Sequence, residues 1–215
     1  MPRLISGLDA MRIRANLERI REEIARAGRD PAEVEILAAV KYVALEELGV
    51  LGEAGVTLLG ENRAQELEAK ASAHPEFRWH FIGQLQSRKV KSILPHVELI
   101  HSVASESALG QLGRHGDGNT RVLLEVNVAG EEGKAGIDPP ELERYLEAAT
   151  VRVDGLMTMP PFAKRPEDSR RHFARLRELA EEHGLKQLSM GTSQDFAVAA
   201  AEGATIVRIG TTLYT

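Results

Sequence analysis

The sequence contains no cysteine in its 215 residues, and this absence excludes disulfides, thiol nucleophiles and cysteine-bound metal sites. It has no excess of basic residues, because 27 Lys and Arg stand against 32 Asp and Glu, and this balance argues against a nucleic-acid partner. No apolar stretch resembles a signal peptide or a membrane span, and the seven histidines include no His-x-x-x-His pair. We therefore expect a cytoplasmic protein with no membrane, nucleic-acid or metal partner.

Short apolar or β-rich runs alternate with amphipathic stretches from about residue 35 to the end of the chain. At roughly 27 residues per unit, eight such units predict an α/β fold, a single (β/α)8 TIM barrel near the lower size limit of that fold. The barrel would span residues 1–215 as one domain, with residues 4–28 as an extra N-terminal helix, although the alternation also permits a doubly wound open sheet. The predicted strands are residues 35–41, 57–60, 78–83, 97–103, 121–128, 153–159, 187–190 and 205–209.

Several connecting segments carry their own signals. Residues 166–183 have helical periodicity and Gly184 supplies a stop, while Asp138-Pro139-Pro140-Glu141 is typical of a capped helix start. Residues 114–119 are predicted to form a loop, and the basic run 88–91 is predicted to be a solvated helix face rather than a phosphate patch.

Lys41 closes the apolar run 36–40, at the point where a buried strand would open into a pocket. Desolvation disfavours the charged form of an amine, and a neutral amine can attack a carbonyl to form a Schiff base. A lysine at a strand end also commonly reaches back to water, so this residue alone leaves both interpretations open.

In a barrel, the loops that leave the carboxyl ends of strands seven and eight often hold a phosphate through backbone N–H groups. Gly191 would let the backbone approach such a group, and Ser193 could cap the next helix or donate its hydroxyl to the anion. Gly210 and Thr211 offer the same chemistry from the neighbouring loop, and we expect the carboxylate of Asp195 to point outwards.

Two polar residues lie inside predicted strands, and each has two interpretations. Arg208 could face a ligand acceptor atom across the pocket from Lys41, or form an ion pair with a glutamate at the barrel floor. His80 could be a catalytic base or a hydrogen-bonded core histidine.

Short motifs spread along the chain provide the strongest signal. They are Lys41, Gly60-Glu61-Asn62, Trp79-His80-Phe81-Ile82-Gly83-Gln84-Leu85-Gln86, Gly155-Leu156-Met157, Leu188-Ser189-Met190-Gly191 and Val207-Arg208-Ile209-Gly210-Thr211. With these motifs in this order and spacing, the chain resembles the pyridoxal phosphate homeostasis protein family, the single-domain relatives of the alanine racemase barrel.

The resemblance implies that Lys41 holds pyridoxal 5'-phosphate as a Schiff base and that Arg208 faces its pyridine nitrogen. An arginine there keeps this nitrogen unprotonated, which weakens the ring as an electron sink and discourages carbanion chemistry. The resemblance also implies three residues that hold the phosphate and three that lie around the cofactor with less defined roles. The first three are Ser193, Gly210 and Thr211, and the others are Asn62, His80 and Met157.

The function that the resemblance implies is a non-catalytic carrier that binds, stores or hands over the cofactor. Its partners would be the cofactor and PLP-dependent apoenzymes, and we expect a monomer because the second domain of the racemase dimer is missing. One alternative is an amino acid racemase of the alanine racemase type, which would need a tyrosine base from that domain. Another is a Schiff-base aldolase acting on a sugar phosphate, although aldolase lysines generally belong to later strands.

Some positions depart from the usual pattern of the family. Tyr42 stands where a threonine commonly follows the lysine, and Arg88 replaces an asparagine. Thr192 and Phe196 replace methionines in the loop after the seventh strand. The sequence ends at Tyr214-Thr215, short of the usual Gly-x-Arg tail; this end could loosen the loop after the eighth strand, or the sequence could be trimmed from a longer chain.

Overall fold

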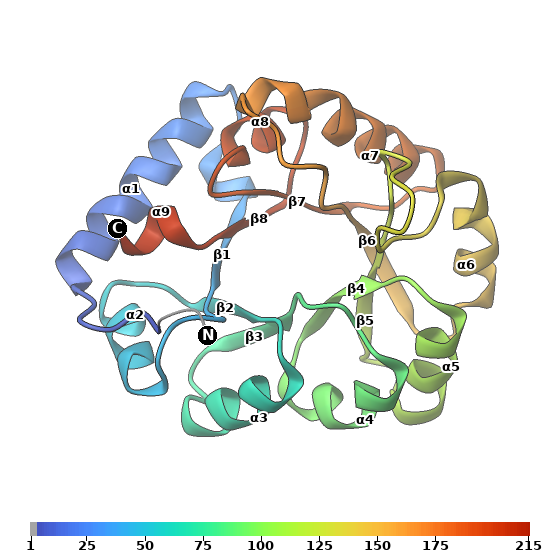
Figure 1. The fold of residues 1–215 in the computed structure, drawn as a ribbon, viewed down its shortest axis with the longest axis horizontal. Coiled ribbons are helices and arrows are strands. Elements are labelled where there is room, and N and C mark those ends of the chain that lie inside the picture. The colour runs from blue at the N-terminus through green and yellow to red at the C-terminus, as the bar shows by residue number, and fades with distance from the viewer. Residues whose placement is uncertain (1–3) are drawn as a thin grey trace.

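The eight strands of the computed structural model form a closed barrel in the order β1 to β8, and every neighbouring pair is parallel. The structure describes residues 4–215, so residues 1–3 of the predicted domain lie outside the described residues. Figure 1 looks down the barrel, with the helices arranged around the ring of strands. The predicted TIM barrel is therefore confirmed. The strands are β1 Glu35–Ala39, β2 Leu58–Glu61, β3 Arg78–Phe81, β4 Leu99–Val103, β5 Arg121–Glu125, β6 Arg152–Met157, β7 Gln187–Thr192 and β8 Ile206–Ile209.

The strands differ from their predicted ranges mainly at the carboxyl ends. The predicted strand 121–128 stops at Glu125, because the next residues turn to pair with a loop segment around Ile137. Ile137 donates its N–H to the carbonyl of Glu125 at 2.7 Å, and Asn127 donates to the carbonyl of Ile137 at 2.9 Å. Apolar character continues past the end of this strand, so composition alone overestimates its length.

The helices cover the outside of the barrel. The predicted N-terminal helix is present but begins at residue 10, where the side chain of Asp9 accepts the N–H of Arg12. Its buried face packs between α2, α8 and α9, as Figure 1 shows. The helices are α1 Ala10–Arg26, α2 Leu48–Glu53, α3 Ala64–Ala73, α4 Val90–Ile93, α5 Glu106–His115, α6 Leu142–Ala148, α7 Arg170–Glu182, α8 Phe196–Ala201 and α9 Thr211–Tyr214.

Two helix starts differ from the sequence prediction. The capping box at Asp138 is wrong, because its side chain makes no capping hydrogen bond; a 3-10 turn, Pro139–Glu141, precedes α6 instead. The extended backbone of Asp138 and the two prolines set this turn. The predicted helix 166–183 likewise opens with a 3-10 turn, Pro166–Ser169, before α7, and the predicted loop 114–119 begins two residues later because α5 extends to His115.

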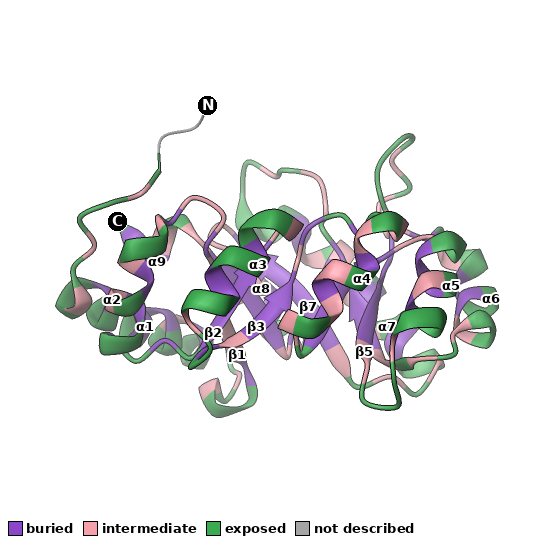
Figure 2. Ribbon diagram, turned by 90° about the horizontal axis from the view of Figure 1, so that it is seen from below, coloured by how far each residue is buried: buried purple, intermediate pink, exposed green. Residues whose placement is uncertain are grey.

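The packing has an inner and an outer layer. Inside the barrel lies a small apolar cluster, and the larger core lies between the sheet and the helices, whose outer faces are exposed (Figure 2). Among residues 4–215, none of the helices is both long and apolar enough to cross a membrane. The inner cluster consists of Leu37, Leu58, Leu99, Leu123, Met157 and Ile206, with Ile82 packed against it.

Candidate active site at the carboxyl rim of the barrel

The carboxyl ends of the strands meet at one rim, because all eight strands run parallel around a closed barrel. Lys41 follows the end of β1, Asn62 follows β2, Ser193 follows β7 and Thr211 follows β8. Since β1 is the neighbour of both β2 and β8, these four positions lie on adjoining parts of the same mouth. The topology therefore brings the predicted lysine and the predicted phosphate loops to one end of the barrel.

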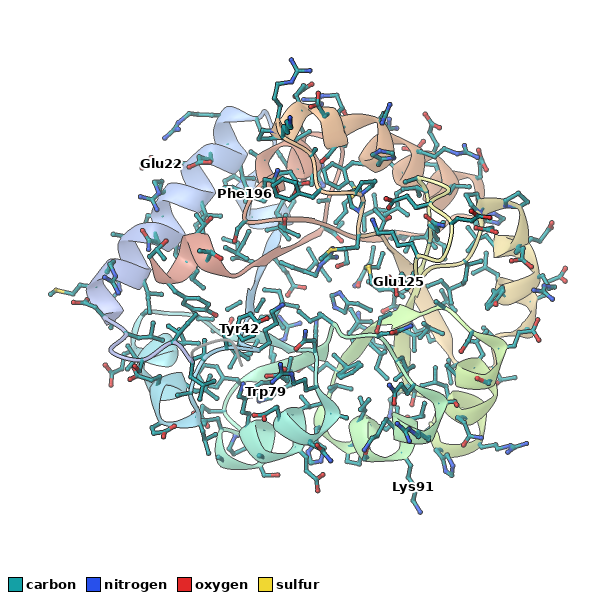
Figure 3. All side chains as sticks on the ribbon, viewed as in Figure 1. Glu22, Tyr42, Trp79, Lys91, Glu125 and Phe196 are labelled. Atoms are coloured by element: carbon teal, nitrogen blue, oxygen red, sulfur yellow. The ribbon has the colours of Figure 1, made fainter. Side chains whose placement is uncertain are left out.

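Lys41 lies two residues beyond the end of β1, in a turn. The ladder reaches the residue before it, because Val40 donates its N–H to the carbonyl of Gly60 at 2.9 Å. The side chain of Lys41 is half-buried, so its amine is less sealed from water than the sequence suggested. Its Nζ lies 4.5 Å from the ring centroid of Tyr42, a cation–π contact, and Figure 3 shows Tyr42 within the ring of strands.

Two buried side chains fix the backbone just before Lys41. Lys70, on α3, donates to the carbonyl of Val40 and forms an ion pair with Glu61, both at 2.7 Å. Tyr214 donates its hydroxyl to the carbonyl of Ala39 at 3.1 Å. The other oxygen of Glu61 accepts the N–H of Asn62 at 2.7 Å. The end of β1 is thus anchored from α3 and from α9.

The loops after β7 and β8 are joined at Ser193. Its Oγ accepts the backbone N–H groups of Gly210 at 3.0 Å and Thr212 at 3.3 Å. The hydroxyl of Thr212 donates back to the carbonyl of Ser193 at 3.2 Å. Two main-chain donors at the start of α9 therefore converge on a half-buried hydroxyl, next to the exposed Thr211.

Two predictions about the loop after β7 need correction, namely the outward direction of Asp195 and the capping role of Ser193. Asp195 does not point outwards, because it is buried and accepts the N–H of Thr192 at 2.8 Å and its hydroxyl at 3.1 Å. Gly191 has φ +88°, and a Cβ added there would lie 2.5 Å from Cβ of Ala199 on α8. Close packing of α8 therefore requires this glycine, whatever approaches from the mouth. Ser193 does not cap α8 either, since it bonds the neighbouring loop.

Arg208 is buried in β8 and is held by acceptors on β7 and after β6. Its Nη1 donates to the carbonyl of Ser189 at 2.8 Å and to Oγ of Ser189 at 2.6 Å. Its Nη2 donates to the carbonyl of Thr158 at 2.9 Å and contacts Sδ of Met159 at 3.3 Å. Among the described residues no carboxylate forms an ion pair with it, so the ion pair at the barrel floor is not found.

The guanidinium of Arg208 has one N–H donor, on Nε, that makes no hydrogen bond within residues 4–215. This Nε atom is not fully buried. Burial lowers the pKa of Arg208 to about 10, with Glu125 and Asp195 opposing this shift by their charge. The group therefore stays charged at neutral pH.

His80 lies inside the barrel and belongs to a buried polar chain. Its Nδ1 lies 2.9 Å from Nε2 of His101, and Nδ1 of His101 lies 2.8 Å from Oγ of Ser189. Burial lowers the pKa of His80 to about 3 and holds the pKa of His101 well below its usual range, so both rings are neutral. Of the two interpretations of His80, the structure places it as a hydrogen-bonded core histidine, although its Nε2 is sealed without a partner.

The remaining predicted residues lie at different depths. Met157 ends β6 and packs in the inner apolar cluster, while Asn62 is half-buried at the rim and its Oδ1 has no partner. Sequence reasoning missed Glu125, at the end of β5 and within the ring of strands in Figure 3. Burial raises the pKa of Glu125, and the charge of Arg208 opposes that shift.

Sequence reasoning also missed His101, Ser189 and Lys70. His101 and Glu125 each stand two positions after a leucine of the inner cluster, Leu99 and Leu123, so they share its inward face. A polar residue at an inward position of a predicted strand was the available signal. Lys70 carried no comparable signal, because lysines on helices are usually exposed.

Comparison with known proteins identifies the family. The family model described as the alanine racemase N-terminal domain matches residues 8–215. A pyridoxal phosphate homeostasis protein of Aquifex aeolicus is 44% identical, over 92% of this chain and 93% of that protein. A pyridoxal phosphate homeostasis protein of Pseudomonas aeruginosa is 41% identical, over 91% of this chain and 90% of that protein. The chain belongs to the pyridoxal phosphate homeostasis protein family. The resemblance seen in the motifs is thereby confirmed.

A similar solved structure carries a ligand. PipY of Synechococcus elongatus, solved with PLP bound, is 32% identical and has a TM-score of 0.75. The match covers 91% of this chain and 100% of that chain. This likeness extends the relationship from the motifs to the whole barrel.

The departures from the pattern of the pyridoxal phosphate homeostasis proteins now have structural settings. Tyr42 contacts the Lys41 amine, Thr192 hydrogen-bonds Asp195, Phe196 is buried at the start of α8, and Arg88 is exposed. The predicted loosening after β8 is not seen. Instead the side chain of Asn16 donates to the carbonyls of Leu213 at 3.0 Å and Thr215 at 3.1 Å, which ties α9 to α1.

Proposed function

We propose that this protein binds pyridoxal 5'-phosphate at the carboxyl rim of the barrel, with a Schiff base to Lys41, and holds the cofactor without turning over a substrate. Its setting would be the cytoplasm, and its partners would be apoenzymes that need the cofactor. The observation that carries the proposal is Arg208, a buried guanidinium held through both Nη atoms with Nε left for another acceptor. It lies on β8, between β1, which leads to Lys41, and β7, which leads to Ser193.

The donors and acceptors of the mouth fit the three chemical parts of this cofactor. Oγ of Ser193 accepts the N–H groups of Gly210 and Thr212, so its own hydroxyl hydrogen is left as a donor that suits the phosphate, and the exposed Thr211 lies beside it. The half-buried amine of Lys41 suits the aldehyde. Nε–H of Arg208 suits an unprotonated ring nitrogen. Asn62, whose Oδ1 is sealed without a partner, lies at the same rim and remains a candidate contact, as do Gly191 and Met157.

The bound cofactor can stabilise a carbanion when its ring nitrogen is protonated. The side chains of this protein work against that state. Arg208 is charged and can only donate, so it favours a nitrogen with a free lone pair and supplies it with no proton at neutral pH. The nearest imidazoles, His80 and His101, are neutral and buried. These properties support a role in holding the cofactor rather than in activating it.

The test is the visible absorption of the purified protein with added pyridoxal 5'-phosphate, followed by borohydride reduction and peptide mass spectrometry. We expect an absorption band that reduction removes, with the label on Lys41. Lys41→Ala should lose the band and keep the parent's circular dichroism, because a half-buried rim residue contributes little to the core. Lys91→Ala is the control, since Lys91 is an exposed lysine that points away from the barrel in Figure 3.

Two results would contradict the proposal. A protein that takes up no cofactor, or that carries the label on another lysine, would refute the Schiff base at Lys41. Racemisation of an amino acid that depends on Lys41 would instead refute the non-catalytic part and favour a racemase. The role of apoenzymes can be checked by mixing the loaded protein with a cofactor-free PLP enzyme and following the recovery of that enzyme's activity.

A further inference from the structure

A continuous chain of hydrogen bonds crosses the interior of the barrel above its apolar floor. It runs from Arg208 on β8 to Ser189 on β7, then to His101 on β4 and His80 on β3. The successive distances are 2.6 Å, 2.8 Å and 2.9 Å, and all four side chains are buried. The chain ends at Nε2 of His80, which is buried and has no hydrogen-bond partner within residues 4–215.

The direction of these hydrogen bonds is set by Arg208. A guanidinium can only donate, so Oγ of Ser189 must accept from Nη1 at one side. The only other partner of this hydroxyl among the described residues is Nδ1 of His101. If Nδ1 carried a proton, the hydroxyl hydrogen of Ser189 would have no acceptor in a fully buried place, which is costly. The hydroxyl therefore donates to Nδ1 of His101.

The two imidazoles continue the same direction. His101 is neutral and accepts at Nδ1, so its proton is on Nε2 and is donated to Nδ1 of His80. His80 is also neutral, and its own proton therefore lies on Nε2, the atom without a partner. This direction leaves one group unsatisfied, the Nε2–H of His80. The opposite direction leaves two, the hydroxyl hydrogen of Ser189 and the lone pair of His80 Nε2.

We propose that His101, supported by His80, is a positioning residue for Arg208. By accepting the Ser189 hydroxyl hydrogen, His101 keeps the oxygen lone pairs of Ser189 turned to Nη1, which fixes the guanidinium and leaves Nε–H for an aromatic nitrogen acceptor of the ligand. The proposal deepens the proposed function, because it selects a ligand ring whose nitrogen is unprotonated.

The first experiment needs no cofactor. Nitrogen-15 NMR of histidine-labelled protein reads the tautomer of each ring, and we expect the proton on Nε2 in both His101 and His80. The Nη–H signals of Arg208, whose protons are donated to Ser189 and Thr158, should be sharp and protected from exchange in the parent. A proton on Nδ1 of His101 would overturn the proposal, whether or not the protein binds pyridoxal 5'-phosphate.

The variants separate positioning from a general loss of packing. His101→Leu keeps the volume but cannot accept a hydrogen bond, so the Nη–H signals of Arg208 should broaden. His101→Gln offers a carbonyl oxygen as acceptor and should restore sharp signals. The matched control is Ser102→Ala on the same strand, because the hydroxyl of Ser102 is buried but donates to the carbonyl of Gly83, outside this chain. Equal broadening in His101→Gln or in Ser102→Ala would show a structural role only.

The effect on the ligand follows from a double-mutant cycle measured by equilibrium dialysis with pyridoxal 5'-phosphate. Ser189→Ala should weaken retention about tenfold, since Arg208 loses one acceptor. Adding His101→Leu to Ser189→Ala should produce little further loss, because His101 acts through that hydroxyl. Independent, additive losses would refute this route. If the parent binds no cofactor, the proposed function fails, while the NMR result still decides whether His101 positions Arg208.

Discussion

Two levels of the barrel interior use the same strands in opposite ways. On β4, β5 and β8, an apolar residue is followed two positions later by a polar one: Leu99 by His101, Leu123 by Glu125, and Ile206 by Arg208. Residues two apart on a strand face the same side, so each pair differs only in its height in the barrel. The lower level is an apolar floor, and the upper level carries the polar chain below the rim.

The contrast indicates where stability and where ligand chemistry reside. Burying a leucine contributes about 1.5 to 3 kcal/mol, whereas burying a polar group costs stability unless its partners are all present. The upper level retains the sealed Nε2 of His80 and the free Nε of Arg208. A fold selected for stability alone would fill this level with apolar side chains, so its polarity points to a ligand.

The largest expected effect concerns the buried ion pair of Lys70 and Glu61, which lies outside the barrel interior and should contribute more to the stability of the fold than the polar level inside it. Lys70→Met should lower the free energy of unfolding by about 3 to 5 kcal/mol, because it leaves Glu61 buried without its partner. Urea denaturation measures the change. The double variant Glu61→Gln with Lys70→Met should recover part of the loss, and Lys91→Met, at an exposed lysine, should have almost no effect. A loss as small as that of Lys91→Met would show that the Lys70–Glu61 pair does not support the rim.

The floor itself is tested by a cavity. Leu123→Ala should lower the free energy of unfolding by about 2 to 5 kcal/mol, since Leu123 is fully buried in the inner cluster. Leu45→Ala, at a leucine 40% exposed, is the control and should cost far less. Affinity of the folded variant for pyridoxal 5'-phosphate should stay close to that of the parent. A large loss of affinity at unchanged stability would reverse the assignment of the two levels.

Much of this architecture was accessible from the sequence. The alternation of eight apolar runs with helical stretches predicted the barrel, and strand ends placed Lys41, Ser193 and Thr211 at one rim. Those inferences depend on local patterns, which a single sequence contains. Strand ends were less accurate, because a ladder such as that of β5 ends where its neighbours turn away rather than where apolar residues run out.

The polar chain could not be predicted in the same way. Ser189 and His101 are separated by 88 positions in the sequence, and their contact depends on two strands facing each other across the barrel. The reason for Gly191 was also hidden, because the close approach of Ala199 depends on how α8 packs. Contacts across the barrel and between layers have no local signature in the chain.

A smaller effect is expected at the rim, where it should appear in affinity rather than in stability. Ser193→Ala should weaken retention of pyridoxal 5'-phosphate by about 0.5 to 3 kcal/mol, the range for one lost phosphate hydrogen bond. Equilibrium dialysis measures this change, and thermal unfolding of the cofactor-free protein shows whether the loops remain joined. Ser92→Ala is the matched control, since the half-buried hydroxyl of Ser92, on α4, donates to the carbonyl of Lys89 just before that helix. Parent-like retention in Ser193→Ala would remove Ser193 from the site.

The smallest effect is a pH dependence of stability, to which the neutral imidazoles of the upper level contribute. The pKa of His80 is lowered to about 3 in the fold, so between that value and its ordinary value of 6.5 the unfolded chain binds the extra proton. Stability from this group is therefore complete above the ordinary value and falls as the pH drops, by up to about 1.4 kcal/mol per pH unit. His101 acts in the same direction, whereas the raised pKa of Glu125 acts in the opposite one.

A comparison of variants isolates the contribution of His80. Urea denaturation of the parent and of His80→Gln, from about pH 6 to about pH 4, should give a shallower slope for the variant. Leu123→Ala should be less stable throughout but parallel to the parent, because the floor contains no group that titrates in this range. Parallel lines for His80→Gln would mean that His80 takes up its proton inside the fold, which would contradict a neutral imidazole at the end of the polar chain.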